Sequence, residues 1–145
     1  MRIKLYLPSV AGVILLLTGT AMGQTTSAPA VQPPAKDADL APLFADVTTD
    51  GPVSAEIMTV GEGLFRANCR QCHGSKGTAG VPLKENEKLA DAYYLTGTIL
   101  TGPGYMTGFA EHLDDTRIAA IASFVRNSWG NDYGAVTPQD VADLR

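Results

Sequence analysis

The spacing of apolar residues near the C-terminus predicts an amphipathic helix. Apolar side chains recur there at the interval of one helix face: Ile118, Ile121, Ala122, Val125 and Trp129. Asp114 stands just before this stripe and is a favourable N-cap residue. We therefore expect a helix that begins after Asp114 and ends near Trp129 and Gly130.

Two further helices are expected earlier in the chain. The first would run into Cys69, with Thr59 and Glu62 placed as a capping box at its start. The second would span residues 91–100, and its inward face would carry four side chains: Tyr94, Leu95, Thr98 and Ile99. Glycines at 74, 77 and 80 and at 102, 104 and 108 predict a loop after each helix.

A short last helix is predicted by Thr137 as its cap and Pro138 in its first turn. Residues 24–53 contain many prolines and alanines without helical or strand periodicity, so we expect a flexible N-terminal extension. The folded domain is expected to occupy residues 54–145. The predicted fold class is all-α, with loops between the helices.

Residues 1–23 have the pattern of an export signal. Arg2 and Lys4 precede an apolar run over residues 5–17, and Ala21-Met22-Gly23 is similar to a cleavage site. This run is shorter than the about 20 residues that a membrane span needs. We therefore expect cleavage after Gly23, a periplasmic protein, and no membrane anchor.

Charge excludes one class of partner. The chain has 11 basic and 15 acidic residues and a net charge of −4. Removal of residues 1–23 would take away two basic residues and no acidic one, which leaves a net charge of −6. Nucleic-acid-binding domains carry a basic face, so a nucleic acid is not an expected partner.

The candidate chemistry lies in Cys69-Arg70-Gln71-Cys72-His73, which contains both cysteines and one of the two histidines of the chain. This spacing is typical of c-type haem attachment. Each thiol can add across a vinyl group of the porphyrin, and the adjacent imidazole can bind the iron. We expect one covalent haem c, with Cys69 and Cys72 as attachment residues and His73 as the proximal iron ligand.

Three other uses of the cysteines fit the sequence less well. A disulfide between residues this close closes a very short loop and stabilises little. A redox-active pair of the thioredoxin type needs a strand–helix context, which the pattern does not predict. A zinc site needs about four ligands, and the other histidine, His112, lies far along the chain.

The second axial position of the iron has several candidates. Met106 lies in the second glycine-rich loop, which can bend over the opposite haem face, and we expect it to be the distal ligand. Met58 lies on the approach to the attachment helix, and His112 stands beside a helix cap. A thioether opposite an imidazole favours ferrous iron and leaves no open position, which favours one-electron transfer.

Supporting residues can also be named. A haem-ligating histidine usually donates its other ring N–H to a carbonyl, and we expect the carbonyl of Pro82 to be this acceptor. Gly61 and Phe65 on the first helix are expected to meet Ile121 and Phe124 on the third. The aromatic candidates to border the haem are Tyr94, Tyr105 and Trp129. The basic residues that flank the attachment sequence are Arg66, Arg70 and Lys76.

The segment from Gly61 to Cys69, the sequence Cys72-His73-Gly74, Met106 and the predicted helix of residues 118–129 resemble, in this order, class I mono-haem cytochromes c. The resemblance implies three core helices around one haem and His/Met ligation. Many such proteins have proline after the ligand methionine, whereas this chain has Thr107. Residues 123–131 and 136–141 are further similar to cytochrome subunits that accompany bacterial periplasmic dehydrogenases.

The predicted function is that of an electron carrier rather than an enzyme. Its expected partners are redox proteins: a dehydrogenase catalytic subunit, another cytochrome or a terminal oxidase. The alternative is a haem enzyme or gas sensor with an open distal iron position, which would require Met106 to be absent from the iron.

Overall fold

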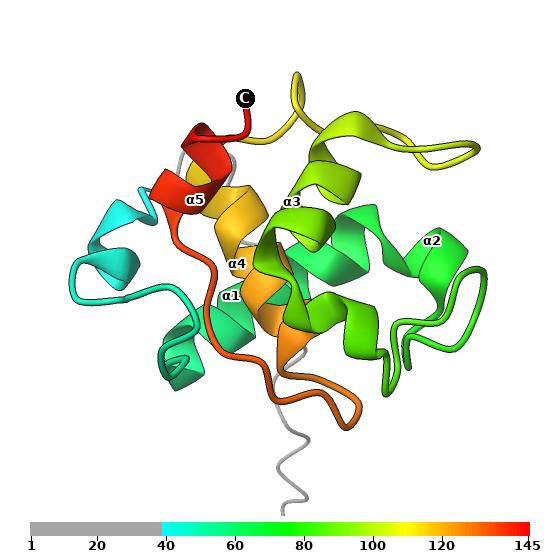
Figure 1. The fold of residues 1–145 in the computed structure, drawn as a ribbon, viewed down its shortest axis with the longest axis horizontal. Coiled ribbons are helices and arrows are strands. Elements are labelled where there is room, and N and C mark those ends of the chain that lie inside the picture. Colours follow the sequence, from blue (N-terminus) through cyan, green and yellow to red (C-terminus); the bar gives the residue numbers. More distant parts are fainter. Residues whose placement is uncertain (1–38) are drawn as a thin grey trace, which may run out of the picture.

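The computed structural model describes residues 39–145, and this part of the chain is helical without strands. The elements are η1 (Ala41–Phe44), α1 (Ala55–Asn68), α2 (Arg70–His73), η2 (Glu87–Ala90), α3 (Ala92–Thr101), α4 (Asp115–Arg126) and α5 (Pro138–Ala142). In Figure 1 the longer helices cross near the middle of the molecule, and long loops connect them around the outside. The all-α prediction is confirmed.

Helices α1 and α4 make the most extensive helix–helix contact of the described residues. Gly61 lies at their crossing, where a Cβ atom would stand 2.3 Å from the Ala120 carbonyl oxygen and 2.6 Å from the Phe124 Cβ. The rings of Phe65 and Phe124 pack with their centroids 5.6 Å apart. The expected approach of α1 to the third core helix is therefore confirmed, although Ala120 rather than Ile121 lies nearest to the glycine.

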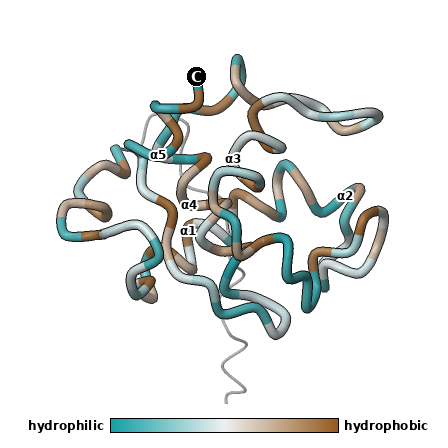
Figure 2. Tube along the Cα trace, viewed as in Figure 1, coloured by the Kyte–Doolittle hydropathy of each residue, from teal (hydrophilic) through white to brown (hydrophobic). Residues whose placement is uncertain are grey.

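Helix α4 forms the centre of the core. Nine consecutive residues, from Ile118 to Arg126, are buried. Figure 2 shows the apolar colour of this helix near the middle of the molecule and more hydrophilic residues in the loop that follows it. Asp114 caps the helix, as predicted, and accepts a hydrogen bond from the Arg117 amide at 2.8 Å.

The predicted end of this helix was wrong by one turn. Helix α4 ends at Arg126, and Trp129 lies in a turn with a positive φ of 55°. The indole ring still packs on the core, with centroids 5.1 Å from Phe65 and 5.3 Å from Phe124. The apolar stripe therefore predicted correctly that Trp129 packs on the core, but this residue is partly buried and lies outside the helix.

The predicted capping box of the first helix was also wrong. Helix α1 begins one turn earlier, and the Ser54 hydroxyl accepts a hydrogen bond from a first-turn amide. Thr59 lies inside the helix and donates to the Ala55 carbonyl, while Glu62 pairs with Arg66 at 3.3 Å. Both residues of the supposed box therefore have partners within the helix.

The other two helices agree more closely with expectation. Helix α3 is capped by Asp91, and its Leu95 and Ile99 are buried as predicted, but Tyr94 is 49% exposed. Helix α5 has Thr137 as its cap and forms a complete capping box with Asp140. The buried face of α3 is turned by about one position, and consists of Ala92, Leu95, Thr96, Ile99 and Leu100.

Residues 40–53, here called the N-terminal strap, pack on the domain. Leu40 and Phe44 are each only 7% exposed. The Asp50 amide donates to the Ala135 carbonyl, and the Ala135 amide donates to the Gly51 carbonyl, both at 2.9 Å. The described part of the predicted extension is therefore held against the segment between α4 and α5.

A side-chain cluster adds to this attachment. The Thr49 hydroxyl donates to the Asp140 carboxylate at 2.7 Å, and the Thr137 amide and hydroxyl donate to it at 2.7 and 2.8 Å. Partial burial raises the pKa of Asp140, but these hydrogen bonds and the positive charge of Arg126 outweigh it and lower the pKa below its ordinary value.

Arg126 is buried to 1% exposure at the end of α4. Its guanidinium donates to an exposed carboxylate and to four backbone carbonyls: Asp50 Oδ1 and the carbonyls of Leu89, Ala90, Gly134 and Ala135. One side chain therefore joins α4 to the N-terminal strap, to η2 and to the segment before α5. The apolar stripe did not predict the burial of this arginine.

Within residues 39–145 no helix combines the length and the apolar character that a membrane crossing requires. The predicted signal of residues 1–23, its cleavage after Gly23 and the first part of the predicted extension lie outside the described residues.

Candidate haem site

The attachment sequence occupies the junction of α1 and α2. Cys69 is the C-cap of α1, and its carbonyl accepts hydrogen bonds from the amides of Cys72 and His73 at 3.1 and 3.0 Å. The two thiols and the imidazole therefore follow one another on a single short turn. Both cysteines are free thiols, with Cys69 partly buried and Cys72 exposed.

The two thiols differ in their surroundings. Burial, with a smaller contribution from the neighbouring Cys72, raises the pKa of the Cys69 thiol to about 12. Cys69 is thus protonated at neutral pH and packs against the core from its partly buried position. Both sulfurs are in the reduced form that thioether formation with a vinyl group requires.

The imidazole of His73 is oriented by a backbone carbonyl. Its Nδ1 lies 3.2 Å from the carbonyl oxygen of Val81. The prediction named the carbonyl of Pro82, which was wrong by one residue, because that carbonyl accepts from the Asn86 side-chain amide at 2.7 Å instead. A hydrogen bond at Nδ1 leaves Nε2 as the nitrogen that can bind a metal.

The loop after His73 is folded back on the domain. Gly74 ends α2 with a positive φ of 72°, and the Ala79 amide returns to the His73 carbonyl at 3.1 Å. At Gly77, also with positive φ, a Cβ would stand 2.7 Å from the ring of Trp129. These glycines allow the loop to bring the Val81 carbonyl to the imidazole.

Met106 lies in a loop whose two ends are in close contact. Gly102 follows α3 with a φ of 63°, and a Cβ there would stand 2.1 Å from the Gly108 amide nitrogen. The Met106 amide donates to the Pro103 carbonyl at 3.2 Å, and its side chain is partly buried against the core. The neighbouring Tyr105 is fully exposed.

The arrangement places the methionine loop and the attachment turn on one side of the fold. In Figure 1 helix α2 and the loop that follows α3 both lie toward the right-hand end of the molecule. Two free thiols, an imidazole with one nitrogen engaged and a thioether are the donor set that a c-type haem needs. The residues present therefore fit this group.

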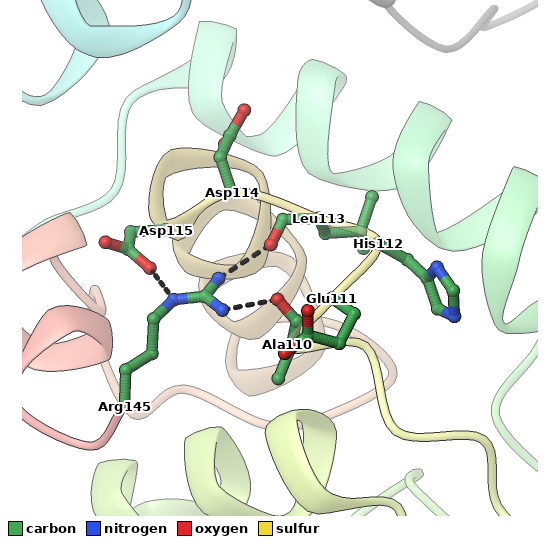
Figure 3. Close-up of a pocket in the computed structure, with 7 residues that line it drawn as sticks. All are labelled: Ala110, Glu111, His112, Leu113, Asp114, Asp115 and Arg145. Carbon is green, nitrogen blue, oxygen red and sulfur yellow. Dashed lines mark hydrogen bonds and ion pairs between the residues drawn. The ribbon is translucent and has the colours of Figure 1, made fainter.

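The other two candidate iron ligands, Met58 and His112, line two hollows of the surface. Met58 is on α1 beside a shallow hollow that is also lined by Asp50, Asn127 and Tyr133. His112 is exposed and lines a second hollow in front of α4. Figure 3 shows its ring pointing away from Arg145, whose guanidinium binds the Asp115 carboxylate and the carbonyls of Ala110 and Leu113.

The remaining sequence candidates have mixed surroundings. Tyr94 and Tyr105 are exposed, whereas Trp129 belongs to the aromatic cluster of the core. Arg66 is paired with Glu62 on the surface of α1, and Arg70 and Lys76 are exposed. Val81, whose carbonyl faces the imidazole, is 70% exposed, and the sequence pattern indicated only its neighbour Pro82.

Residues 56–125 match a family model described as cytochrome c oxidase, cbb3-type, subunit III. This segment contains all four proposed haem-binding residues. A cytochrome c6 of Tetradesmus obliquus is 29% identical over 84 residues, which cover 52% of this chain and 94% of that protein. The all-α fold and these matches are those of a class I c-type cytochrome domain. A covalently bound haem c is accordingly the cofactor of this cytochrome domain.

Two other relatives are subunits of dehydrogenases. The cytochrome is 29% identical over 119 residues to the cytochrome c subunit of a quinone-dependent alcohol dehydrogenase of Gluconobacter oxydans (strain 621H), with 66% of this chain covered. It is 34% identical over 106 residues to the gluconate 2-dehydrogenase cytochrome c subunit of Pantoea cypripedii, with 59% covered. The alignments span about a quarter of the length of these two relatives, 25% and 24%.

Proposed function

We propose that this cytochrome is a periplasmic electron-transfer protein in which His73 and Met106 bind the haem iron and Cys69 and Cys72 hold the haem by thioether bonds. The observation that carries the proposal is the single turn at the end of α1, which presents two free thiols and an imidazole with Nδ1 engaged. The bound haem supplies an iron that alternates between the ferric and ferrous states.

The chain's own residues account for the electron-transfer role. The Val81 carbonyl fixes the ring of His73, and the closed loop of residues 102–108 holds Met106 in place. Ligands fixed by the fold move little when the iron changes its charge. If His73 and Met106 both bound the iron, no position would be open for oxygen or peroxide, and the protein would pass electrons without transforming a substrate.

The proposed electron donor and location are supported by the relatives and by the pattern of residues 1–23. Two of the relatives are named as cytochrome subunits of dehydrogenases, so we propose a dehydrogenase as the electron donor and another cytochrome or a terminal oxidase as the acceptor. The basic and apolar pattern of residues 1–23 supports export, with cleavage after Gly23.

The iron ligands are tested by spectroscopy on holoprotein made with the haem-attachment machinery. Parent protein should keep its haem after acid–acetone extraction and show the thioether-to-ferric charge-transfer band in the red. Met106→Ala should lose this band, and His112→Ala, which changes an exposed side chain, should keep it. Retention of the band in Met106→Ala would refute the distal ligand, and loss of haem on extraction would refute covalent attachment.

A further inference from the structure

Three consecutive backbone carbonyls beside the attachment turn accept hydrogen bonds from three different side chains. In residues 81–83 the first carbonyl faces His73 Nδ1 at 3.2 Å. The second accepts from Asn86 Nδ2 at 2.7 Å, and the third accepts from Asn131 Nδ2 at 2.8 Å. The acceptor of the imidazole is therefore followed by two carbonyls that are each fixed by an amide side chain.

Asn131 connects this segment to the core. It is 5% exposed and lies in the loop after α4. Besides the Leu83 carbonyl, its Nδ2 donates to the Val125 carbonyl of α4 at 3.0 Å, and its Oδ1 accepts from the Asn86 amide at 3.0 Å. The amide nitrogen and the amide oxygen of the Asn131 side chain are therefore both engaged, which fixes the orientation of the side chain.

Asn86 closes the arrangement from the other side. Its backbone amide is held by Asn131, its Nδ2 holds the Pro82 carbonyl, and its Oδ1 caps η2 by accepting from the Lys88 amide at 3.1 Å. Pro82 itself has a fixed φ. Residues 81–83 therefore have little freedom to move relative to α4.

We propose that Asn131 and Asn86 are positioning residues that hold the Val81 carbonyl against the imidazole of His73, and so set how strongly this histidine binds the haem iron. The inference rests on the proposed role of His73 as the proximal ligand. Neither asparagine touches the imidazole, and each acts through the backbone of residues 81–83.

The expected direction follows from the hydrogen bond at Nδ1. A close carbonyl draws on the N–H proton, which raises the basicity of the ring as a ligand and favours the ferric state. When residues 81–83 are free to move, the hydrogen bond lengthens, the imidazole donates less to the iron, and the reduction potential rises. Hydrogen bonding around a haem is one of the means by which a protein sets this potential.

The test compares Asn131→Ala with Asn127→Ala in holoprotein. Asn127 is a matched control, because it lies in the same loop and also makes three hydrogen bonds, to Ser123 and to both backbone groups of Gly134. None of these reaches residues 81–83. We expect Asn131→Ala to shift the ferric–ferrous equilibrium about threefold toward ferrous, or about 28 mV at 59 mV per tenfold for one electron, and Asn127→Ala to leave it unchanged.

A second readout isolates the imidazole. In the diamagnetic ferrous protein, the His73 Nδ1–H proton should exchange with water faster in Asn131→Ala than in the parent. Its exchange rate in Asn127→Ala should equal that of the parent. Asn86→Ala changes a less buried residue and should shift both readouts in the same direction. Asn86→Ala therefore provides the same test if Asn131→Ala does not fold.

The experiment distinguishes failure of the positioning role from failure of the proposed function. If the parent holds covalent haem but both variants match Asn127→Ala in potential and in Nδ1–H exchange, the positioning role is overturned while the proposed function stands. If the parent shows no covalent haem, or replacing His73 leaves its low-spin spectrum unchanged, the proposed function fails first.

Discussion

Replacing Arg126 with methionine should destabilise the cytochrome strongly without touching the proposed haem ligands. Methionine keeps much of the aliphatic volume and removes the guanidinium. The bonds to the Leu89 and Ala135 carbonyls are fully buried, whereas the partner carboxylate of Asp50 is 65% exposed. The two buried carbonyls are therefore the groups that lose most.

The size of the effect can be worked from these contacts. Each buried carbonyl left without a donor costs about 1–3 kcal/mol, so two cost about 2–6 kcal/mol. Removal of a buried charge recovers part of its desolvation cost, which places the net loss at about 2–4 kcal/mol. The free energy of unfolding of a domain is about 5–15 kcal/mol, so this loss is a large fraction of it.

Urea unfolding of holoprotein, followed by far-ultraviolet circular dichroism, measures the loss. The control is Arg66→Met, since Arg66 is 45% exposed and forms an ion pair with Glu62 one turn earlier in α1. Exposed pairs of this kind contribute about 0.3–0.5 kcal/mol. Equal losses in the two variants would show that the carbonyls around Arg126 find other partners, and would refute the reasoning.

Two further predictions concern packing and pH. Gly61→Ala should lower the free energy of unfolding by about 1–3 kcal/mol, because the added methyl group overlaps the Ala120 carbonyl and Phe124; urea unfolding checks this, and an unchanged midpoint would contradict it. For Asp140, a folded-state pKa below the ordinary value of 3.8 means that its stabilisation is complete above that value and is lost as the pH falls through the folded-state pKa. Asp140→Asn should therefore weaken the fold at neutral pH and flatten the acid side of the stability curve, as measured by urea unfolding across the acidic range. A curve that runs parallel to the parent's would exclude this role for Asp140.

Local chemistry made several features predictable from the sequence. Asp114 and Thr137 are helix caps because their side chains serve amides within the next three residues, so no distant partner is needed. The crossing of α1 and α4 was predictable from one glycine and the aromatic residues around it. The spacing of Cys69, Cys72 and His73 specifies a chemistry before any fold is known.

Features that depend on distant residues were not predictable. Thr59 satisfied the rule for a capping box, but Ser54 one turn earlier competes for the same role and is the cap. Arg126 stands next to an apolar stripe, and its burial depends on carbonyls 36–37 residues earlier and 8–9 residues later. The periodicity of side chains along the sequence does not predict which backbone carbonyls will surround a given residue.

The Val81 acceptor shows the same limit at shorter range. Pro82 and Val81 are adjacent, and a sequence argument has no means of choosing between their carbonyls. The choice is made by Asn86, which occupies the Pro82 carbonyl from a turn that Asn131 holds in place.

The crossing of α1 and α4 has a consequence for how this molecule can change over evolutionary time. The helices that meet at Gly61 enclose, in sequence, the attachment turn and the loop of residues 102–108, which together carry the proposed iron ligands. The contact between α1 and α4 therefore brings together the two ends of the segment that lies between them. Closure cost grows only slowly with loop length, so insertions near Gly104, where an added side chain would meet open space, should lengthen the surface offered to a partner while the two framing helices keep their contact. One frame could thereby acquire new redox partners by loop exchange alone.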